Sequence, residues 1–265
     1  MCNRSMLEIE PTKRFSSRVE HYVCARPAYP KQILQVLSEE CGFSPAATVA
    51  DIASGTGIFT RLLLENGNRI FAVEPNQEMR RAAEESLAQY ANFSSVEGTA
   101  ERTTLPDGAV DFITCAQAAH WFDAKAARRE FQRILKPEGF LILVWNDRRI
   151  VDSPFAADYE ELITQYGIDY IEVKRRGTGA AARLFASYPY RQRRLSNFQE
   201  LDYRTLEQRL LSSSYVPQLN HERCAPMLAK LRKIFDCYQQ SGRIRMDYDT
   251  KLYLGRLREQ ERQHI

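Results

Sequence analysis

The residues best suited to chemistry lie in one glycine-rich segment, Val49-Ala50-Asp51-Ile52-Ala53-Ser54-Gly55-Thr56-Gly57. Glycines directly after a buried strand let the backbone approach a ligand closely, and the helix that follows begins with unpaired N–H groups. Glu74 lies 17 residues beyond Gly57, at the end of the next predicted strand. A carboxylate at that place can accept hydrogen bonds from the 2′- and 3′-hydroxyls of a ribose. The spacing therefore predicts a nucleoside site.

Three interpretations of this segment are open. A dinucleotide site typically has the pattern G-x-G-x-x-G, but the third glycine position, counted from Gly55, holds Thr60. S-adenosylmethionine has no phosphate, and the Asp51 carboxylate, which would repel a pyrophosphate, suits the ammonium group of its methionine end. The third interpretation is a strand-to-helix turn without a ligand. The residues favour S-adenosylmethionine.

The elements that must position these residues follow an alternating pattern. Apolar runs predict strands at 48–53, 69–73, 93–96, 110–115 and 140–145. Helical spacing of apolar residues predicts helices at 31–41, 59–66, 77–90 and 124–135, the last of them ended by a turn at 136–139. Strands that are apolar on both faces and alternate with helices are typical of a parallel sheet covered on both sides. We expect an α/β fold with a doubly wound, mostly parallel sheet.

The alternation stops after Trp145. Helices are predicted at 154–166, 205–213 and 223–240, and strands at 197–203 and 245–254. Two late strands separated by helices indicate a hairpin that completes a seven-stranded sheet and carries an inserted helical cap. We therefore expect a single domain over 1–265, with a cofactor-binding core at 31–146 and a cap formed by 150–195 and 205–240.

Composition excludes several classes of protein. With 44% apolar and 27% charged residues the chain is not a disordered, collagen-like or coiled-coil sequence. A net charge of +3 does not indicate a nucleic-acid partner, and no two of the six cysteines are spaced as a zinc or redox pair. The longest apolar run, Phe140 to Trp145, is too short to span a bilayer, and the N-terminus lacks the apolar core of a signal peptide. We expect a soluble cytoplasmic protein, a monomer or homodimer, without a metal.

Four segments in order resemble the motifs of class I methyltransferases: DIASGTG, VEPNQEM, GTAERTTLPDGAVDFITCAQAAHWF and LKPEGFLILVWN. They are most similar to the small-molecule branch, methyltransferase type 11, that includes ubiquinone-biosynthesis and trans-aconitate methyltransferases. The resemblance covers about residues 15 to 146, and weakly the predicted strands near 197 and 245. It implies a Rossmann-like fold and S-adenosylmethionine as cofactor. One departure is Ala53, which replaces the first glycine of the family motif, and we expect the turn to tolerate it.

The resemblance also implies which residues contact the cofactor. The methionine half is expected beside Asp51, Ala53, Gly55, Thr56, Gly57 and Gln117. The ribose is expected on Glu74, and the adenosine beside Pro75, Asn76, Met79, Thr99, Ala100 and Glu101. The segment from Phe15 to Pro30 resembles the start of this branch, so Tyr22 and Arg26 could close over the cofactor and contact its carboxylate. The alternative for that segment is a rigid proline-rich lead-in that only packs on the sheet.

His120, after the fourth predicted strand, is the candidate general base, because histidine takes up a proton near neutral pH. Its alternative role is structural, and a carboxylate acceptor would need no base. The same position argues against amino-methylating DNA enzymes, which place an Asn/Asp-Pro-Pro motif there, whereas this chain has Gln117-Ala118-Ala119-His120.

Seven basic residues between Lys174 and Arg194 occur without an intervening acid. They suit a cap for an anionic substrate or a patch for RNA, and the alternative is a solvated face. We therefore expect an S-adenosylmethionine-dependent methyltransferase acting on a small molecule, with an anionic or carboxylate acceptor as the candidate class. The alternatives are a non-catalytic S-adenosylmethionine-binding module, an RNA methyltransferase and a nicotinamide-dependent oxidoreductase.

Overall fold

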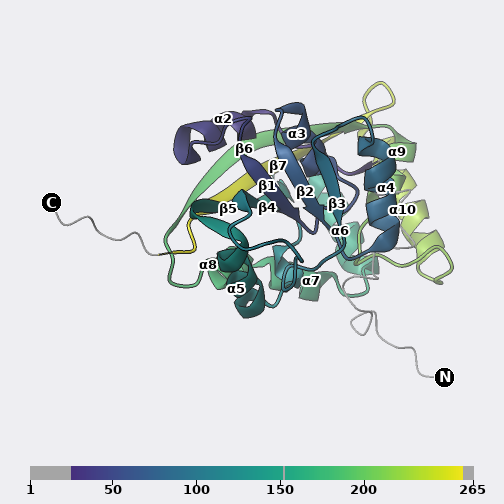
Figure 1. Cartoon of the computed structure of the whole chain (residues 1–265). Helices are drawn as coiled ribbons and strands as arrows, with labels where there is room; N and C mark the ends of the chain where they lie inside the picture. The colour runs from purple at the N-terminus through teal and green to yellow at the C-terminus, as the bar shows by residue number, and fades with distance from the viewer. Residues whose placement is uncertain (1–24, 152, 259–265) are drawn as a thin grey trace. The chain divides into compact units, whose positions relative to one another are not determined.

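The computed structural model describes residues 25–151 and 153–258 (Figure 1). The chain divides into two compact units. The core unit comprises 29–145, 179–195 and 250–258 of the described residues, and the helical unit comprises 25–28, 146–178 and 196–249. Tyr22 lies outside the described residues.

Seven strands form one sheet in the order β3-β2-β1-β4-β5-β7-β6. Their bounds are β1 Thr48–Ile52, β2 Arg69–Val73, β3 Phe93–Val96, β4 Val110–Ala116, β5 Leu135–Arg148, β6 Tyr190–Leu201 and β7 Ile244–Gly255. β1 pairs in parallel with both β2 and β4, and the β2–β3 and β4–β5 pairs are parallel too. The predicted doubly wound, mostly parallel seven-stranded sheet is confirmed.

The helices of the core unit are α2 Gln32–Cys41, α3 Ile58–Glu65, α4 Gln77–Leu87, α5 Ala124–Ile134 and α8 Ala180–Phe185, with a short 3₁₀ turn, η4, at Ala119–Trp121. Local capping determines where two of them begin. The side chain of Asn76 accepts a hydrogen bond from Met79 N (2.9 Å) at the start of α4. Asp123 accepts from Lys125 N and Ala126 N (both 3.0 Å) at the start of α5. These caps satisfy N–H groups that a helix leaves open in its first turn.

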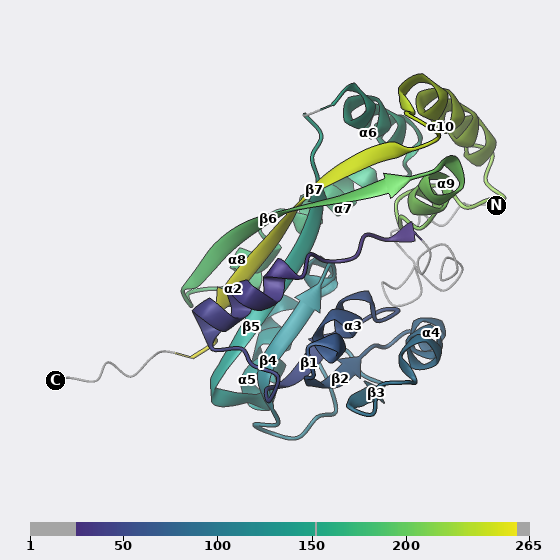
Figure 2. The same ribbon diagram turned by 90° about the horizontal axis from the view of Figure 1, so that it is seen from above.

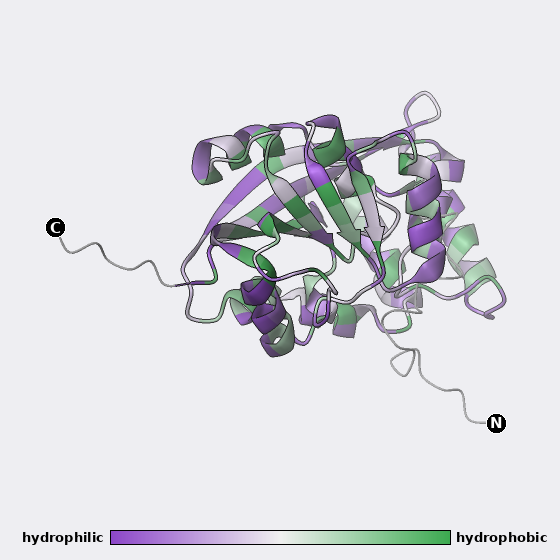
Figure 3. Ribbon diagram, in the orientation of Figure 1, coloured by the Kyte–Doolittle hydropathy of each residue, from purple (hydrophilic) through white to green (hydrophobic). Residues whose placement is uncertain are grey.

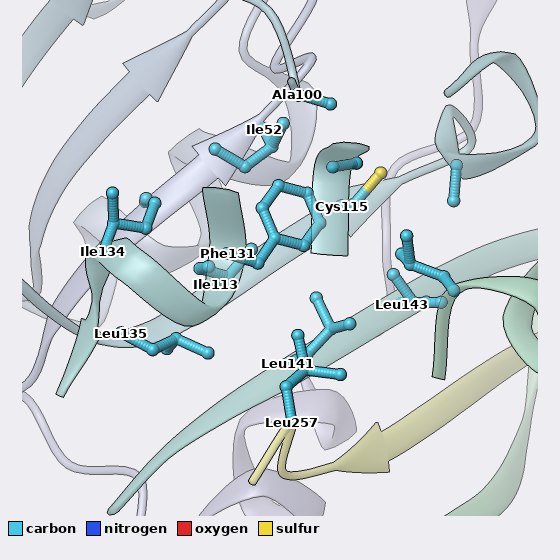
Figure 4. Close-up of a cluster of buried hydrophobic side chains, with 14 of the residues drawn as sticks. Ile52, Ala100, Ile113, Cys115, Phe131, Ile134, Leu135, Leu141, Leu143 and Leu257 are labelled. Atoms are coloured by element: carbon cyan, nitrogen blue, oxygen red, sulfur yellow. The ribbon is translucent and has the colours of Figure 1, made fainter. Parts of the chain in front are cut away.

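The central strands bury both faces, because alternate side chains enter two different apolar clusters. Ala50 and Ile52 of β1 pack in one cluster with Phe131 of α5 (Figure 4), whereas Val49 packs in the other with Leu63 of α3. Figure 1 shows α2 and α3 on the face of the sheet opposite α5 and α8. Figure 3 shows the matching contrast between hydrophobic central strands and hydrophilic outer sides of α4 and α5.

The helical unit has an apolar core of its own. Its helices are α6 Pro154–Tyr166, α7 Tyr170–Gly177, α9 Tyr203–Leu211 and α10 Cys224–Tyr238 (Figure 2). Fully buried Leu162, Leu206 and Leu231, from three of these helices, share one cluster with Tyr248 of β7. The helices therefore occur where the sequence predicts a helical cap, and α6 has the predicted bounds.

Two segments differ from the sequence prediction. The predicted turn at 136–139 belongs to β5, where Val110 pairs with Leu135 and Phe112 already pairs with Phe140. Five steps along β5 therefore face two along β4, so the segment bulges out of the ladder rather than ending the strand. β6 begins at Tyr190, well before 197, because its exposed basic residues hide the strand alternation. The sequence analysis also missed α7 and α8.

Gly57 provides a test of the turn that precedes α3. Gly55 and Gly57 both have left-handed φ values, +59° and +82°, but a Cβ on Gly57 would lie 2.6 Å from Leu87 Cδ1, whereas on Gly55 it would meet Met79 Sδ at 3.5 Å. Both alanine variants incur the left-handed strain, and only Gly57→Ala also overpacks the core. We expect Gly57→Ala to lower the free energy of unfolding by about 1–3 kcal/mol more than Gly55→Ala. Equal losses in urea denaturation of the cofactor-free protein would contradict this packing.

Candidate functional site

The turn between β1 and α3 has an unusual backbone. Ala53, Gly55 and Gly57 all have positive φ values, 54°, 59° and 82°. Ala53 takes a conformation that favours glycine, so the departure from the family motif keeps the backbone shape at a cost of about 1–2 kcal/mol. Gly57 is the N-cap of α3 and no side chain caps this end. The first N–H groups of α3 are therefore left for a ligand.

Glu74 holds this turn from the neighbouring strand. It follows β2 and is 7% exposed; its Oε2 accepts from Gly55 N (3.0 Å) and its Oε1 from Asn76 N (2.9 Å). Burial raises the pKa of Glu74, and the two backbone N–H groups oppose that shift. Each carboxylate oxygen has a second lone pair. Glu74 can therefore hold the turn and still accept hydrogen bonds from ribose hydroxyls.

Asp51 is buried in β1, the strand that pairs with β2 on the inner side of the sheet. Its side chain is 1% exposed, its Oδ2 accepts from Thr60 Oγ1 of α3 (2.6 Å) and its Oδ1 accepts from Thr114 Oγ1 of β4 (2.8 Å). Burial raises the pKa of Asp51 to about 6, against the effect of the two threonine hydrogen bonds. The predicted contact with the methionine ammonium group stays a prediction. What the structure shows is a carboxylate that ties β1, α3 and β4 together.

The residues predicted for the adenosine lie in two loops of the core unit. Pro75 and Asn76 connect β2 to α4, and the sulfur of Met79 faces the turn at Gly55. Thr99, Ala100 and Glu101 lie in the loop after β3, where Thr99 pairs with Arg102, and Ala100 is buried in one cluster with Ile52 and Val73. Glu101 Oε1 accepts from Asp123 N (3.0 Å). The structure thus brings Ala100 and Met79 to the ends of β1 and β2.

The loop after β4 carries the candidate base. Gln117 has a positive φ of 62°, and its N–H donates to Val144 O (2.9 Å). His120, half-buried in η4, has its ring 4.7 Å from that of Trp121. Since β4 pairs in parallel with β1, this loop follows the same end of the sheet as the glycine turn.

Thr56 tests whether a ligand suits the turn. Its side chain is 5% exposed, and its Oγ1 is buried without a hydrogen-bond partner among the described residues. A buried unpaired hydroxyl costs about 1–3 kcal/mol, which a polar ligand at the turn would offset. With Glu74 in place for a ribose, the residues present fit S-adenosylmethionine.

The other predicted features lie elsewhere. Arg26 belongs to the helical unit, where its Nη2 donates to Ser212 O (2.6 Å), so its contact with the cofactor stays a prediction. Most residues of the basic run pair with carboxylates: Arg175 and Arg176 pair with Glu172 of the same helix, Lys174 pairs with Glu160, and Arg191 and Arg193 pair with Glu40.

No group of His, Cys, Asp or Glu side chains within 25–151 and 153–258 could hold a metal ion. In the same residues, no helix combines the length and the apolar character that crossing a membrane requires.

Sequence analysis missed Thr60 and Thr114. Both threonines are buried and bind Asp51, one from a helix and one from a strand. Thr60 entered the sequence argument only as the residue in place of a third glycine. Its place beside Phe59 in the apolar stretch of α3 was the available signal in the sequence. Thr114 gave no such signal, because only the fold brings it to Asp51.

Known proteins that are similar to this chain are named as methyltransferases. The model of the methyltransferase domain family matches residues 50–143, from β1 to β5. An uncharacterized methyltransferase-like protein of Schizosaccharomyces pombe is 28% identical over 94% of this chain and 97% of its own length. An uncharacterized methyltransferase of Mycobacterium tuberculosis is 39% identical over 51% of this chain and 52% of its own.

A solved structure is similar in fold. A protein from Anaeromyxobacter dehalogenans, named provisionally as a type II methyltransferase, aligns with a TM-score of 0.65 over 89% of this chain and 99% of its own. The two sequences are 22% identical, so this likeness concerns the fold.

Asp51→Asn should reveal the buried carboxylate through pH. A carboxyl group whose pKa is raised by folding gives stability that is present at low pH and lost as the pH rises through the folded value. From about pH 3 to about pH 7 the wild type should lose roughly 3 kcal/mol that the asparagine variant keeps. Glu74, whose pKa is also raised, is present in both proteins, so its effect largely cancels. Parallel curves of unfolding free energy against pH would refute the burial of this charge.

Proposed function

We propose that this chain, which is similar to class I S-adenosylmethionine-dependent methyltransferases, uses that cofactor to methylate a small molecule that carries an anionic group. The observation that carries the cofactor assignment is Glu74, a buried carboxylate that accepts the N–H of Gly55 in the turn and keeps lone pairs for a ribose. The unpartnered hydroxyl of Thr56 supports a ligand in the same turn.

S-adenosylmethionine, when bound, supplies a methyl group already activated on a sulfonium sulfur. The acceptor atom forms a bond to that carbon while the carbon–sulfur bond breaks, and the electron pair stays on the sulfur. The chain therefore has to hold the donor, align the acceptor and exclude water. Such positioning lowers the barrier by about 7–11 kcal/mol. One general base typically contributes 10²–10⁴-fold in rate, which corresponds to about 3–5 kcal/mol.

Three groups of the core unit divide this work. The backbone N–H groups at the start of α3 and the Gly55 turn would hold the donor, and Glu74 would accept hydrogen bonds from its ribose. His120, after β4, takes the proton when the acceptor is a hydroxyl or an amine.

The alternatives lose support from the same geometry. Thr60 occupies the place of a third glycine and spends its hydroxyl on Asp51, which disfavours a pyrophosphate on this helix. The basic run between Lys174 and Arg194, which suggested RNA, is largely paired with the chain's own carboxylates.

Glu74→Ala should weaken S-adenosylmethionine binding at least tenfold, since hydrogen bonds to a charged acceptor are worth about 1.5–3 kcal/mol each. Glu85→Ala is the matched control, because it removes an exposed carboxylate from α4. Isothermal titration should show the loss for the first variant alone, and no binding of NAD by the wild type. Because Glu74 also holds Gly55, thermal unfolding without ligand must show that the variant folds. An unchanged dissociation constant in a folded variant would remove Glu74 from the site.

His120→Gln should lower kcat by about 10²–10⁴-fold while S-adenosylmethionine affinity stays unchanged. The measurement uses an acceptor found by screening pools of metabolites for methyl uptake. Wild-type kcat in the variant would show that the acceptor atom carries no proton at reaction, as in a carboxylate, and that His120 is structural.

A further inference from the structure

The helical unit buries an arginine without a counter-charge. Arg209 on α9 is 5% exposed. Its Nη1 donates to Ser213 Oγ at 3.3 Å and its Nε to Tyr248 Oη at 3.4 Å, both neutral groups at long distance. Within 25–151 and 153–258 no carboxylate forms an ion pair with it. A buried guanidinium is costly unless an anion accompanies it, so this site calls for a negative group.

A second arginine, Arg148, is buried in the same unit. Arg148, at the end of β5, has a side chain 13% exposed, and its guanidinium carbon lies 4.9 Å from the ring centre of Tyr159 on α6. Its Nη2 pairs with Glu160 Oε2 (2.9 Å), but Nη1 is buried without a partner in the described chain. The hydroxyl of Tyr159, which is 2% exposed, is unpartnered there in the same way.

Among the described residues, Glu160 is the carboxylate that forms an ion pair with Arg148, and it has other partners as well. Glu160 Oε1 also accepts from Tyr170 Oη (2.5 Å) and from Lys174 Nζ (2.9 Å). One negative charge is thus divided between Arg148 and Lys174, and none is left for Arg209. Within the part of the chain that the structure describes, a share of one carboxylate is therefore the only ion-pair partner of the buried guanidinium groups of Arg148 and Arg209.

Tyr215 reports the resulting potential. Burial raises the pKa of its phenol, yet the net shift is downward, because Arg148, Arg209, a hydrogen bond from Ser213 and Arg26 all lower it. All these groups belong to the helical unit, where the ends of β6 and β7 meet α6, α7 and α9 (Figure 2). A lowered pKa for a buried tyrosine is the direction that neighbouring positive charge produces.

We propose that Arg148 and Arg209, with the hydroxyls of Tyr159 and Tyr215, form a site for a carboxylate group. Resting on the proposed function, we assign this carboxylate to the methyl acceptor. The planar guanidinium fork matches a carboxylate in shape and offers paired donors, and the tyrosine hydroxyls supply further donors. The basic run is a poorer site, because Arg175 is 76% exposed and already paired with Glu172.

The test uses the full-length protein, with succinate as the probe and its uncharged diamide, succinamide, as the control ligand. Succinate should bind in isothermal titration and raise the unfolding temperature, and succinamide should do neither. Arg209→Met should weaken succinate binding at least about tenfold. Without ligand, this variant should be as stable as the wild type or more so, because it removes an unpaired buried charge. Arg209→Lys, which keeps the charge but loses the fork, should fall between the two.

The matched control is Arg175→Met, which removes one exposed positive charge from the same unit and should leave succinate binding unchanged. The proposal fails if succinate binds wild type and Arg209→Met equally, if it binds neither, or if inorganic phosphate alone binds in an Arg209-dependent way. A markedly less stable Arg209→Met protein would indicate a structural arginine and would also overturn it. These readouts need no methyl transfer, so a carboxylate site without methylation would contradict the proposed function alone. Methylation with a KM unaffected by Arg209→Met would contradict this site alone.

Discussion

The core unit depends on how the buried carboxyl group of Asp51 is satisfied. Its two oxygens take one hydroxyl from α3 and one from β4, so a single side chain of β1 sets the distance to the helix on one side and the strand on the other. The backbone between Asp51 and α3 must then complete its turn within a few residues. It does so with left-handed φ values at every second position, namely Ala53, Gly55 and Gly57. Glu74 holds the middle of that turn from β2. The strained turn, the uncapped N-terminus of α3 and the Glu74 carboxylate are therefore parts of one arrangement.

Much of the core unit could be predicted because its signals are local. β2 and β3 have the predicted bounds, since each is a short apolar run between polar turns. The bulge in β5 could not be predicted, because lysine, proline and glycine at 136–139 favour a turn and only the pairing of Phe112 with Phe140 shows the strand continuing. The glycine turn and Glu74 were found from spacing alone. Thr60 and Thr114 were not, because their role depends on contacts with Asp51 that only the fold makes, 9 positions apart for Thr60 and 63 for Thr114.

The helical unit was harder to predict because its important residues resemble ordinary surface residues. Arg209 lies on an amphipathic helix among other charged residues, and an arginine there normally faces water. Tyr159 and Tyr248 suggest only a hydrophobic core, in which their rings do take part. Tertiary burial turns these residues into a charged interior. The basic run looks unpaired in the sequence because two of the carboxylates that pair with it, Glu40 and Glu160, lie outside it along the chain.

The two units bury charges of opposite sign, and both leave them undercompensated. In the core unit two carboxyl groups, Asp51 and Glu74, are buried among neutral donors, and their pKa values are raised. In the helical unit the Arg209 guanidinium is buried among hydroxyls, Arg148 shares the Glu160 carboxylate with Lys174, and the pKa of Tyr215 is lowered. A cationic donor and an anionic acceptor are the pair of ligands that would relieve both. Since a ligand that binds only the folded state adds to its stability, each reactant would recover part of the free energy that folding spends on burying these charges. Binding of the proposed donor and of the proposed acceptor would then be favoured by one physical cause, the burial of charge that the chain leaves undercompensated.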